Sequence, residues 1–317
     1  MQVVNSSTYS TNTLRQGRLG LNPSQRLLFD ELLQIGKPRP VASPTLADYL
    51  RAKIIDGTSK SLDKWTENRL FIGKSQLVQA LSCEGLVVAN AAERENNVMH
   101  QATAVGIATH KAIQLAHTHP GKNIIWYVDH ALISSREESN FSEFWEAASI
   151  GIQSDVKVQA LSKTTGFLDT FPPLDPAWGW RFEESIQAKV GKLTIGGKVD
   201  LTLGRPRSDG RQTILLCDFK TGALKEDHDL EAGFYALIST LRNGVPPFRS
   251  TVLSLSSGEW SHADIDESRL LDVADSVILA VEKVVSGLTE ERELVLTGGF
   301  YCRYCPSNTT CTSSTLL

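Results

Sequence analysis

Two short segments decide the fold of this chain: GGKVDL at residues 196–201 and LLCDFKTG at residues 215–222. Apolar residues occupy alternate positions from 193 to 203, which predicts a strand with one buried face. Residues 213–220 form a second strand around an apolar centre. The polar turn at 205–210 lets the two strands pair as antiparallel neighbours. An antiparallel strand pair is therefore expected at the centre of this region.

If the two strands pair in this way, three polar side chains are expected to meet at one end of the pair. Asp200 has the parity opposite to the apolar residues of its strand, so it projects away from their face and can face Asp218. Asp218 and Lys220 point the same way, while Phe219 points back. Carboxylates bind Mg²⁺ or Mn²⁺, and a lysine beside them can orient or deprotonate a water that attacks phosphorus. An Asp–Lys pair of this spacing is also common on solvated surfaces, so the pair alone leaves both interpretations open.

The same segments resemble motifs of a known nuclease superfamily. Residues 197–200 match G-x-x-D, and residues 218–222 match D-[YF]-K-T-G, of the RecB-like branch of the PD-(D/E)XK nucleases. Residues 106–110 match its upstream G-x-x-x-H motif, whose histidine is a metal ligand in relatives. The resemblance implies a restriction-endonuclease-like α/β fold, with a mixed central sheet flanked by helices. It also implies a site for Mg²⁺ or Mn²⁺, with the expected ligands His110, Asp200, Asp218 and Phe219.

Two other positions fit the family pattern less closely. The family has Q-x-x-x-Y on the helix after the lysine, and here Glu231 replaces the glutamine while Tyr235 is kept. A glutamate can accept hydrogen bonds or bind metal, but it cannot donate an amide proton. The family also often has an acidic residue on the strand before G-x-x-D, and Glu183 and Glu184 both fit that position. The expected catalytic residues are Asp200, Asp218, Lys220, Glu231 and Tyr235.

The cysteines indicate a second metal centre. The last three follow the spacing C-x2-C-x5-C, which suggests zinc or an iron–sulfur cluster. Cys83 is the candidate fourth ligand, because Cys217 lies in the apolar centre of a strand and is better interpreted as a small buried residue. The order resembles the iron–sulfur staple of CRISPR-associated RecB-like nucleases and of the AddB nuclease domain. The resemblance implies a 4Fe-4S cluster, with zinc as the alternative, on Cys83, Cys302, Cys305 and Cys311.

The rest of the sequence suggests four regions: a flexible tail at 1–20, a helical N-terminal region at 21–70, a nuclease domain at 71–311, and a tail at 312–317. Further helices are expected at 75–83, 101–117, 229–242 and 268–285, and further strands at 181–190 and 250–255. Within an insert at 120–178, residues 123–128 suggest a strand, and the other residues are not assigned.

The composition of the chain mainly excludes classes of protein. The chain has 317 residues, and its apolar fraction of 41% is ordinary for a globular protein. The net charge of −4 gives no overall basic field, but a local basic groove can still bind nucleic acid. The N-terminus lacks the features of a secretory signal, and no apolar run approaches the roughly 20 residues that span a bilayer. We therefore expect a cytoplasmic protein that does not bind membranes.

These features predict a metal-dependent DNA nuclease, and an exonuclease on DNA ends or single strands more than an endonuclease. A role in DNA repair or antiviral defence would agree with the resemblance. The alternative is a DNA-binding or assembly subunit of a recombination, CRISPR-adaptation or phage-defence complex, with a protein partner and only minor or conditional cutting. The choice between single-stranded DNA, double-stranded DNA and RNA stays open.

Overall fold

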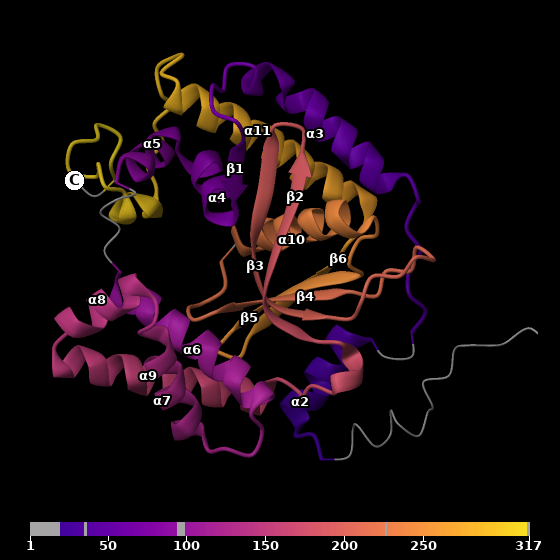
Figure 1. Ribbon diagram of the computed structural model, residues 1–317, viewed down its shortest axis with the longest axis vertical. Coiled ribbons are helices and arrows are strands. Elements are labelled where there is room, and N and C mark those ends of the chain that lie inside the picture. The colour runs from indigo at the N-terminus through magenta and orange to yellow at the C-terminus, as the bar shows by residue number, and fades with distance from the viewer. Residues whose placement is uncertain (1–19, 35–36, 94–98, 226, 316–317) are drawn as a thin grey trace, which may run out of the picture.

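A mixed six-stranded sheet lies at the centre of the protein (Figure 1). The computed structural model describes residues 20–34, 37–93, 99–225 and 227–315. Across the sheet the order is β1 (Leu70–Gly73), β3 (Leu193–Leu203), β4 (Leu215–Lys220), β5 (Arg249–Ser254) and β6 (Trp260–Asp264), and β2 (Arg181–Val190) pairs with β3 off this path. The β1–β3 and β4–β5 pairs are parallel and the others are antiparallel. The expected mixed sheet flanked by helices is confirmed.

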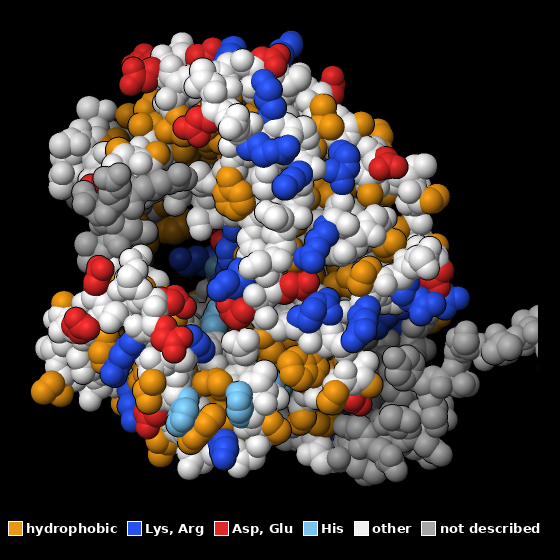
Figure 2. Space-filling view, viewed as in Figure 1, with side chains coloured by type: hydrophobic (Ala, Val, Ile, Leu, Met, Phe, Trp, Pro, Cys, Tyr) orange, Lys and Arg blue, Asp and Glu red, His pale blue; other side chains and the backbone are white. Residues whose placement is uncertain are grey.

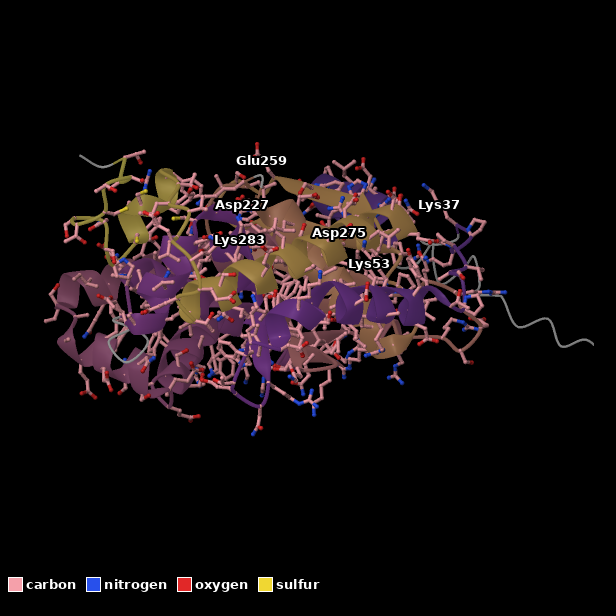
Figure 3. The ribbon with its side chains drawn as sticks, turned by 90° about the horizontal axis from the view of Figure 1, so that it is seen from above. Lys37, Lys53, Asp227, Glu259, Asp275 and Lys283 are labelled. Atoms are coloured by element: carbon pink, nitrogen blue, oxygen red, sulfur yellow. The ribbon has the colours of Figure 1, made fainter. Side chains whose placement is uncertain are left out.

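Three helices cover one face of this sheet. α10 (Asp227–Asn243) and α11 (Glu267–Leu288) pack against it, and α3 (Leu46–Leu62) packs along α11. α11 adopts this position because its apolar residues recur every three or four positions, as Leu270, Val273, Ala274, Val277 and Val281 show. Figure 3 shows Lys53 of α3 and Asp275 of α11 between the two helices, with Nζ and Oδ1 2.6 Å apart. Because Asp275 is well exposed, this ion pair contributes little to stability.

Four helices form a lobe with a core cluster of its own: α6 (Gln101–Thr118), α7 (Ile124–Ser135), α8 (Ser139–Ala147) and α9 (Ile150–Thr170). The strand expected at 123–128 is wrong, because these residues begin α7. The Asn123 side chain accepts a hydrogen bond from the Trp126 amide and caps the helix. The buried residues of α7 then follow helical spacing: Tyr127, Val128, Ala131, Leu132 and Ser135. The insert is thus largely helical.

The remaining elements complete the two ends of the sheet. α2 (Pro23–Leu28) and the π-helical η1 (Phe29–Leu33) join a second core cluster that also contains residues of β4 and α9. α4 (Lys74–Ser82) and α5 (Glu84–Ala92) follow β1 directly. Two short 3₁₀ helices, η3 (Pro176–Trp178) and η4 (Phe300–Tyr304), lie before β2 and near the C-terminus. Nearly all of the tail expected at 1–20 lies outside the described residues. In the described ranges, no helix has both the length and the apolar character needed to cross a membrane.

β3 contributes to two different cores. Leu193, Ile195 and Val199 pack in the cluster with α10 and α11, whereas Leu201 and Leu203 pack in the cluster with α2 and α9. β2 also passes from one core cluster to the other near this point, because Phe182 packs against the second cluster and Ile186 belongs to the first. The predicted alternation is correct, but the apolar side chains do not all pack into one core. Asp200 and Glu183 lie where the change occurs.

Candidate active site

β1 and β4 approach each other along one edge of β3. β2 occupies the other edge of β3 over nearly its whole length. β1 pairs in parallel with residues 193–196 of β3, and β4 pairs antiparallel with residues 201–203, so the carboxyl ends of β1 and β4 point toward one another. One further step in the β3–β4 register sets Asp200 opposite Asp218. Side chains at the ends of both strands therefore converge on residues 197–200.

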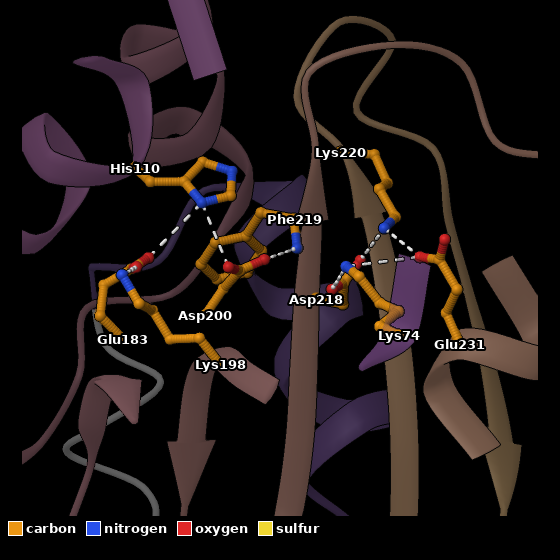
Figure 4. A network of polar contacts seen from close by, with 9 residues as sticks. All are labelled: Lys74, His110, Glu183, Lys198, Asp200, Asp218, Phe219, Lys220 and Glu231. Carbon is orange, nitrogen blue, oxygen red and sulfur yellow. Dashed lines mark hydrogen bonds and ion pairs between the residues drawn. The ribbon is translucent and has the colours of Figure 1, made fainter. Parts of the chain in front are cut away.

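Lys220 lies between two carboxylates (Figure 4). Its Nζ is 2.6 Å from Asp218 Oδ2, and it donates a hydrogen bond to Glu231 Oε2 from α10. The side chain of Asp218 is only 5% exposed and that of Glu231 15%. The structure thus brings together Asp218, Lys220 and Glu231 from two elements. A glutamate suits this position because it gives the ammonium group a charged acceptor.

A second lysine, Lys74, joins the same cluster and was not expected from the sequence. Its Nζ lies 3.2 Å from Asp218 Oδ1 and 3.5 Å from Glu231 Oε2. It also lies 5.3 Å above the centre of the Tyr235 ring. Lys74 is the first residue of α4, directly after β1, and it reaches the site because β1 ends there. With Lys220, it gives the cluster two cations against two acids.

The charges of this cluster stabilise one another. Burial acts to lower the pKa of Lys74, but Asp218, Tyr235 and Glu231 together raise that pKa above its ordinary value. Burial acts to raise the pKa of Asp218, but Lys74 and Lys220 bring that pKa below its ordinary value. Both shifts favour the charged forms at neutral pH. Lys74 and Asp218 therefore form an ion pair at neutral pH.

His110 of α6 faces two carboxylates beside this network (Figure 4). Its Nδ1 is 3.1 Å from Asp200 Oδ1 and 3.5 Å from Glu183 Oε1. The ligand atoms of these three residues all lie within 4.8 Å of one another. Glu184 instead pairs with two arginines. Of the two candidate glutamates, the structure brings only Glu183 to the site.

This trio suits a hard divalent cation. Burial acts to lower the pKa of His110, but Asp200 and Glu183 raise it to about 10. The same negative field that holds a proton on the imidazole would attract a metal ion in its place, because metal binding to histidine displaces that proton. One imidazole nitrogen and several carboxylate oxygens form a donor set that Mn²⁺ or Mg²⁺ can use.

The backbone of Glu183 is strained. Its φ is +51°, in the left-handed region that non-glycine residues rarely adopt. Its neighbours in β2 keep the register with β3, so the distortion is confined to one residue. Its carboxylate is also 3.1 Å from Lys198 Nζ. Such a conformation costs roughly 1–3 kcal/mol and typically occurs at functional sites.

Phe219 and Tyr235 pack beside the polar side chains of the site. The Phe219 ring packs 5.0 Å from the ring of Phe167, while its N–H donates to Asp200 Oδ2 over 2.5 Å. Only the backbone of Phe219 thus faces the acidic residues. Tyr235 is 3% exposed, and a Cβ added at Gly197 would lie 2.8 Å from its Cε1 atom. The glycine of G-x-x-D is therefore required by the close approach of this ring.

The four cysteines of the expected cluster lie at one end of the molecule. Burial is the largest cause that raises the pKa of Cys305, and nearby Cys83, Cys311 and Cys302 raise it further. Among the described residues, the ligand atoms that all lie within 4.8 Å of one another are those of the His110 trio. The cysteine sulfurs are therefore not gathered into an equally tight set. Cys217 is fully buried in the second core, as expected.

Glu84 anchors the segment that leads to these cysteines. It is 2% exposed and accepts hydrogen bonds from Arg292 Nη1 (2.8 Å) and the Val295 amide (2.9 Å). The Thr297 amide then donates to the Sγ of Cys83, which is next to Glu84 (3.5 Å). The C-terminal segment is thus held against the junction of α4 and α5.

A family model described as the PD-(D/E)XK nuclease superfamily matches residues 80–312. This chain belongs to that superfamily. Comparison of this nuclease with curated proteins gives no match. Among solved structures, a protein called SSO0001 is 10% identical over 84% of this chain and 96% of its own, with a TM-score of 0.32. A protein from Eubacterium rectale that is provisionally named an exonuclease is 11% identical over 72% of this chain and 85% of its own, with a TM-score of 0.39.

Membership makes the chain a hydrolytic nuclease of a superfamily that uses divalent metals, and DNA is the substrate that this membership implies. The matched region contains the His110 trio and the Asp218–Lys220 pair. Lys74 lies before it, so this nuclease places a cation in its active site from outside the matched residues.

Proposed function

We propose that this nuclease is a RecB-like exonuclease that digests DNA from its ends in a reaction dependent on Mg²⁺ or Mn²⁺. The convergence of the His110, Glu183 and Asp200 trio with the Asp218–Lys220 pair carries the proposal. The threonine and glycine after Lys220, and the G-x-x-x-H motif that ends at His110, favour the RecB-like branch.

Each residue has a defined task in this proposal. His110, Glu183, Asp200 and Asp218 would hold the metal, which when bound offsets the negative charge that develops on the phosphate oxygens. Lys220 orients the attacking water by a hydrogen bond from its ammonium group. Glu231 fixes the position of the Lys220 ammonium group through their hydrogen bond. The Phe219 amide holds the Asp200 carboxylate in place.

The shape of the site favours a strand end as substrate. The helical lobe carries His110 to the sheet and bounds the site on one side. Figure 2 shows a hollow between this lobe and the rest of the molecule. A recessed site admits the end of a strand more easily than the middle of a duplex.

A comparison of linear and circular DNA tests the exonuclease proposal. With Mn²⁺, the protein should degrade a linear single strand and leave a covalently closed circle of the same sequence intact. Cutting of the circle would show an endonuclease. If neither DNA is cut, the nuclease proposal fails, and a DNA-binding or assembly role takes its place.

We also propose that the cysteines hold a 4Fe-4S cluster that ties the segment after α11 to α4. The ligands would be Cys83, Cys302, Cys305 and Cys311. Zinc bonds of about 2.3 Å would set tetrahedral sulfurs only about 3.8 Å apart, and the cysteines are not gathered into so tight a set. The cluster would close a loop of more than 200 residues between Cys83 and Cys302, which constrains the unfolded chain.

Protein purified without oxygen tests the cluster. It should be brown, and its visible absorption should disappear in Cys305→Ala. Cys217→Ala is the matched control and should keep the colour, because Cys217 lies in the other core. A colourless wild-type protein that contains zinc would overturn this proposal and leave the nuclease site unaffected.

A further inference from the structure

The charged side chains of the active site form two neighbouring groups (Figure 4). One is the His110 trio, whose ligand atoms all lie within 4.8 Å of one another. The other is an acid–lysine cluster, which we define by Asp218, Glu231, Lys74 and Lys220. We propose that Lys74 occupies the place of a second divalent ion, so that this nuclease binds one ion and not two.

Asp218 and Glu231 lie where a second ion would be expected. In nucleases that use two metal ions, the ions are about 3.5–4 Å apart and bind to neighbouring acidic side chains. Asp218 is opposite Asp200 of the trio, one step beyond the paired residues of β3 and β4. The two acids of the cluster would offer such an ion the carboxylate oxygens that Mg²⁺ and Mn²⁺ prefer. A group that keeps a second ion out must therefore lie between them.

Lys74 lies between these two acids (Figure 4). Its Nζ is 3.2 Å from Asp218 Oδ1 and 3.5 Å from Glu231 Oε2. An ion bound by the same two oxygens would be in contact with this ammonium group. The two cations would repel each other strongly, because the site is largely shielded from solvent. Lys74 and a second ion therefore exclude one another.

The fold holds Lys74 in this place. Lys74 begins α4 directly after β1, and β1 is fixed by its parallel pairing with β3. The Gly73 amide donates to Gln76 Oε1 (3.3 Å), which sets the first turn of the helix at the end of the strand. The Lys74 ammonium also lies 5.3 Å from the centre of the buried Tyr235 ring, whose face attracts a cation. With a side chain that is 24% exposed, Lys74 is part of the site and not a solvated surface group.

The charges of the site balance with one divalent ion. Four carboxylates line it, two in the trio and two in the acid–lysine cluster, and His110 is neutral when it binds a metal. The two lysines of the cluster offset two negative charges, and one ion in the trio offsets the other two. A second ion would leave excess positive charge beside Asp218, whose side chain is only 5% exposed, and buried uncompensated charge is unfavourable. Lys198, at 59% exposure, is screened by solvent.

Glu231 fits the same arrangement. With the glutamine that the resembled family has at this position, Lys74 and Lys220 would share the single carboxylate of Asp218. The glutamate gives the second ammonium group a charged partner of its own. A fixed ammonium group can also offset charge on a phosphate oxygen, as a second ion does, because lysine binds phosphate as a point charge. The change at residue 231 and the lysine at residue 74 thus belong together.

This inference rests on the proposed function, because the ion in question is the ion of that reaction, but its test counts bound ions and does not measure cutting. The probe is Mn²⁺ without DNA, in equilibrium dialysis with the bound metal measured per chain. Wild type should bind one Mn²⁺. Lys74→Met should bind two, because it uncovers the carboxylates of Asp218 and Glu231. Lys74→Met combined with Glu231→Gln should return to one, because only a single acid remains beside Lys220.

Lys53→Met is the matched control, because Lys53 also pairs with an acid but lies between α3 and α11. It should bind one Mn²⁺, as wild type does. Lys74→Gln is a second variant that keeps a polar side chain at this position, and it should also bind two. Two ions in wild type would overturn the inference, as would a single ion in both Lys74 variants. One ion in wild type and two in the Lys74 variants, without any cutting of DNA by wild type, would overturn only the proposed function.

Discussion

Replacement of Lys74 by methionine tests whether the active-site charges are balanced as a group. The cluster holds Asp218 and Glu231 against Lys74 and Lys220, so Lys74→Met leaves one excess negative charge. At an effective dielectric constant of about 20, two unit charges 4 Å apart attract by about 4 kcal/mol. The desolvation of an ammonium whose side chain is 24% exposed offsets much of this attraction. Because Lys220 still pairs with both acids, we expect a net loss of about 1–2 kcal/mol.

The double variant makes the test specific. Glu231→Gln alone leaves one excess positive charge, whereas Lys74→Met with Glu231→Gln restores neutrality. The free energy of unfolding, from urea titration in EDTA, should therefore fall in each single variant and recover by about 1 kcal/mol or more relative to additivity in the double variant. Lys53→Met is the matched control, because it breaks a single exposed pair and should cost less than about 1 kcal/mol. Strictly additive losses for Lys74 and Glu231 would refute the balanced network.

Three other substitutions probe separate parts of the structure. Glu183→Gln should weaken Mn²⁺ binding about tenfold or more in calorimetry, because it removes a carboxylate oxygen of the His110 trio. Glu184→Gln should bind Mn²⁺ like wild type, and equal losses in the two variants would contradict the assignment of Glu183 to the metal site. Gly197→Ala should lower the free energy of unfolding by about 1–3 kcal/mol, because its Cβ would meet a buried tyrosine ring 2.8 Å away, and an unchanged urea midpoint would show that the close contact is absent. Arg292 lowers the pKa of Glu84, so their pair stabilises the fold above the ordinary carboxyl pKa of about 4.3, and that stability is lost as the pH falls through the lowered pKa. The difference in the free energy of unfolding between wild type and Glu84→Gln should therefore shrink in acid. A difference that is independent of pH down to about 2 would contradict this pairing.

The strands that carry the motif residues could be predicted because their sequence is unambiguous locally. β3 begins and ends where the alternation begins and ends, and the register of β4 with β3 sets Asp200 toward Asp218. The alternation of apolar residues did not show that β3 contributes to two cores. Alternation tells which face of the strand a side chain is on, but it gives no information about how the strand twists. α7 was misassigned because its first residues, IIWYV, are all typical of strands, and only the cap at Asn123 and the positions buried later reveal the helix.

Other parts of the site depend on contacts between distant segments. β1 has only four residues, so it leaves little periodic signal, and Lys74 was missed with it. The choice between Glu183 and Glu184 depends on a left-handed backbone at one residue, which the sequence of a glutamate pair does not indicate. The register of β2 against β3, which brings Glu183 opposite Asp200, follows from packing over the whole hairpin.

Metal-dependent hydrolysis by an Asp218 variant tests whether Asp218 belongs to the active site of this nuclease. The measurement is the rate of nucleotide release from a labelled linear single strand, with Mn²⁺ and with EDTA. Wild type and the exposed-turn control Asp209→Asn should both cut with Mn²⁺ and not with EDTA. Asp218→Asn should lose on the order of a hundredfold or more in rate, because several kcal/mol of transition-state stabilisation depend on the metal that this carboxylate helps to hold. Cutting by Asp218→Asn at the wild-type rate would contradict the assignment of the active site.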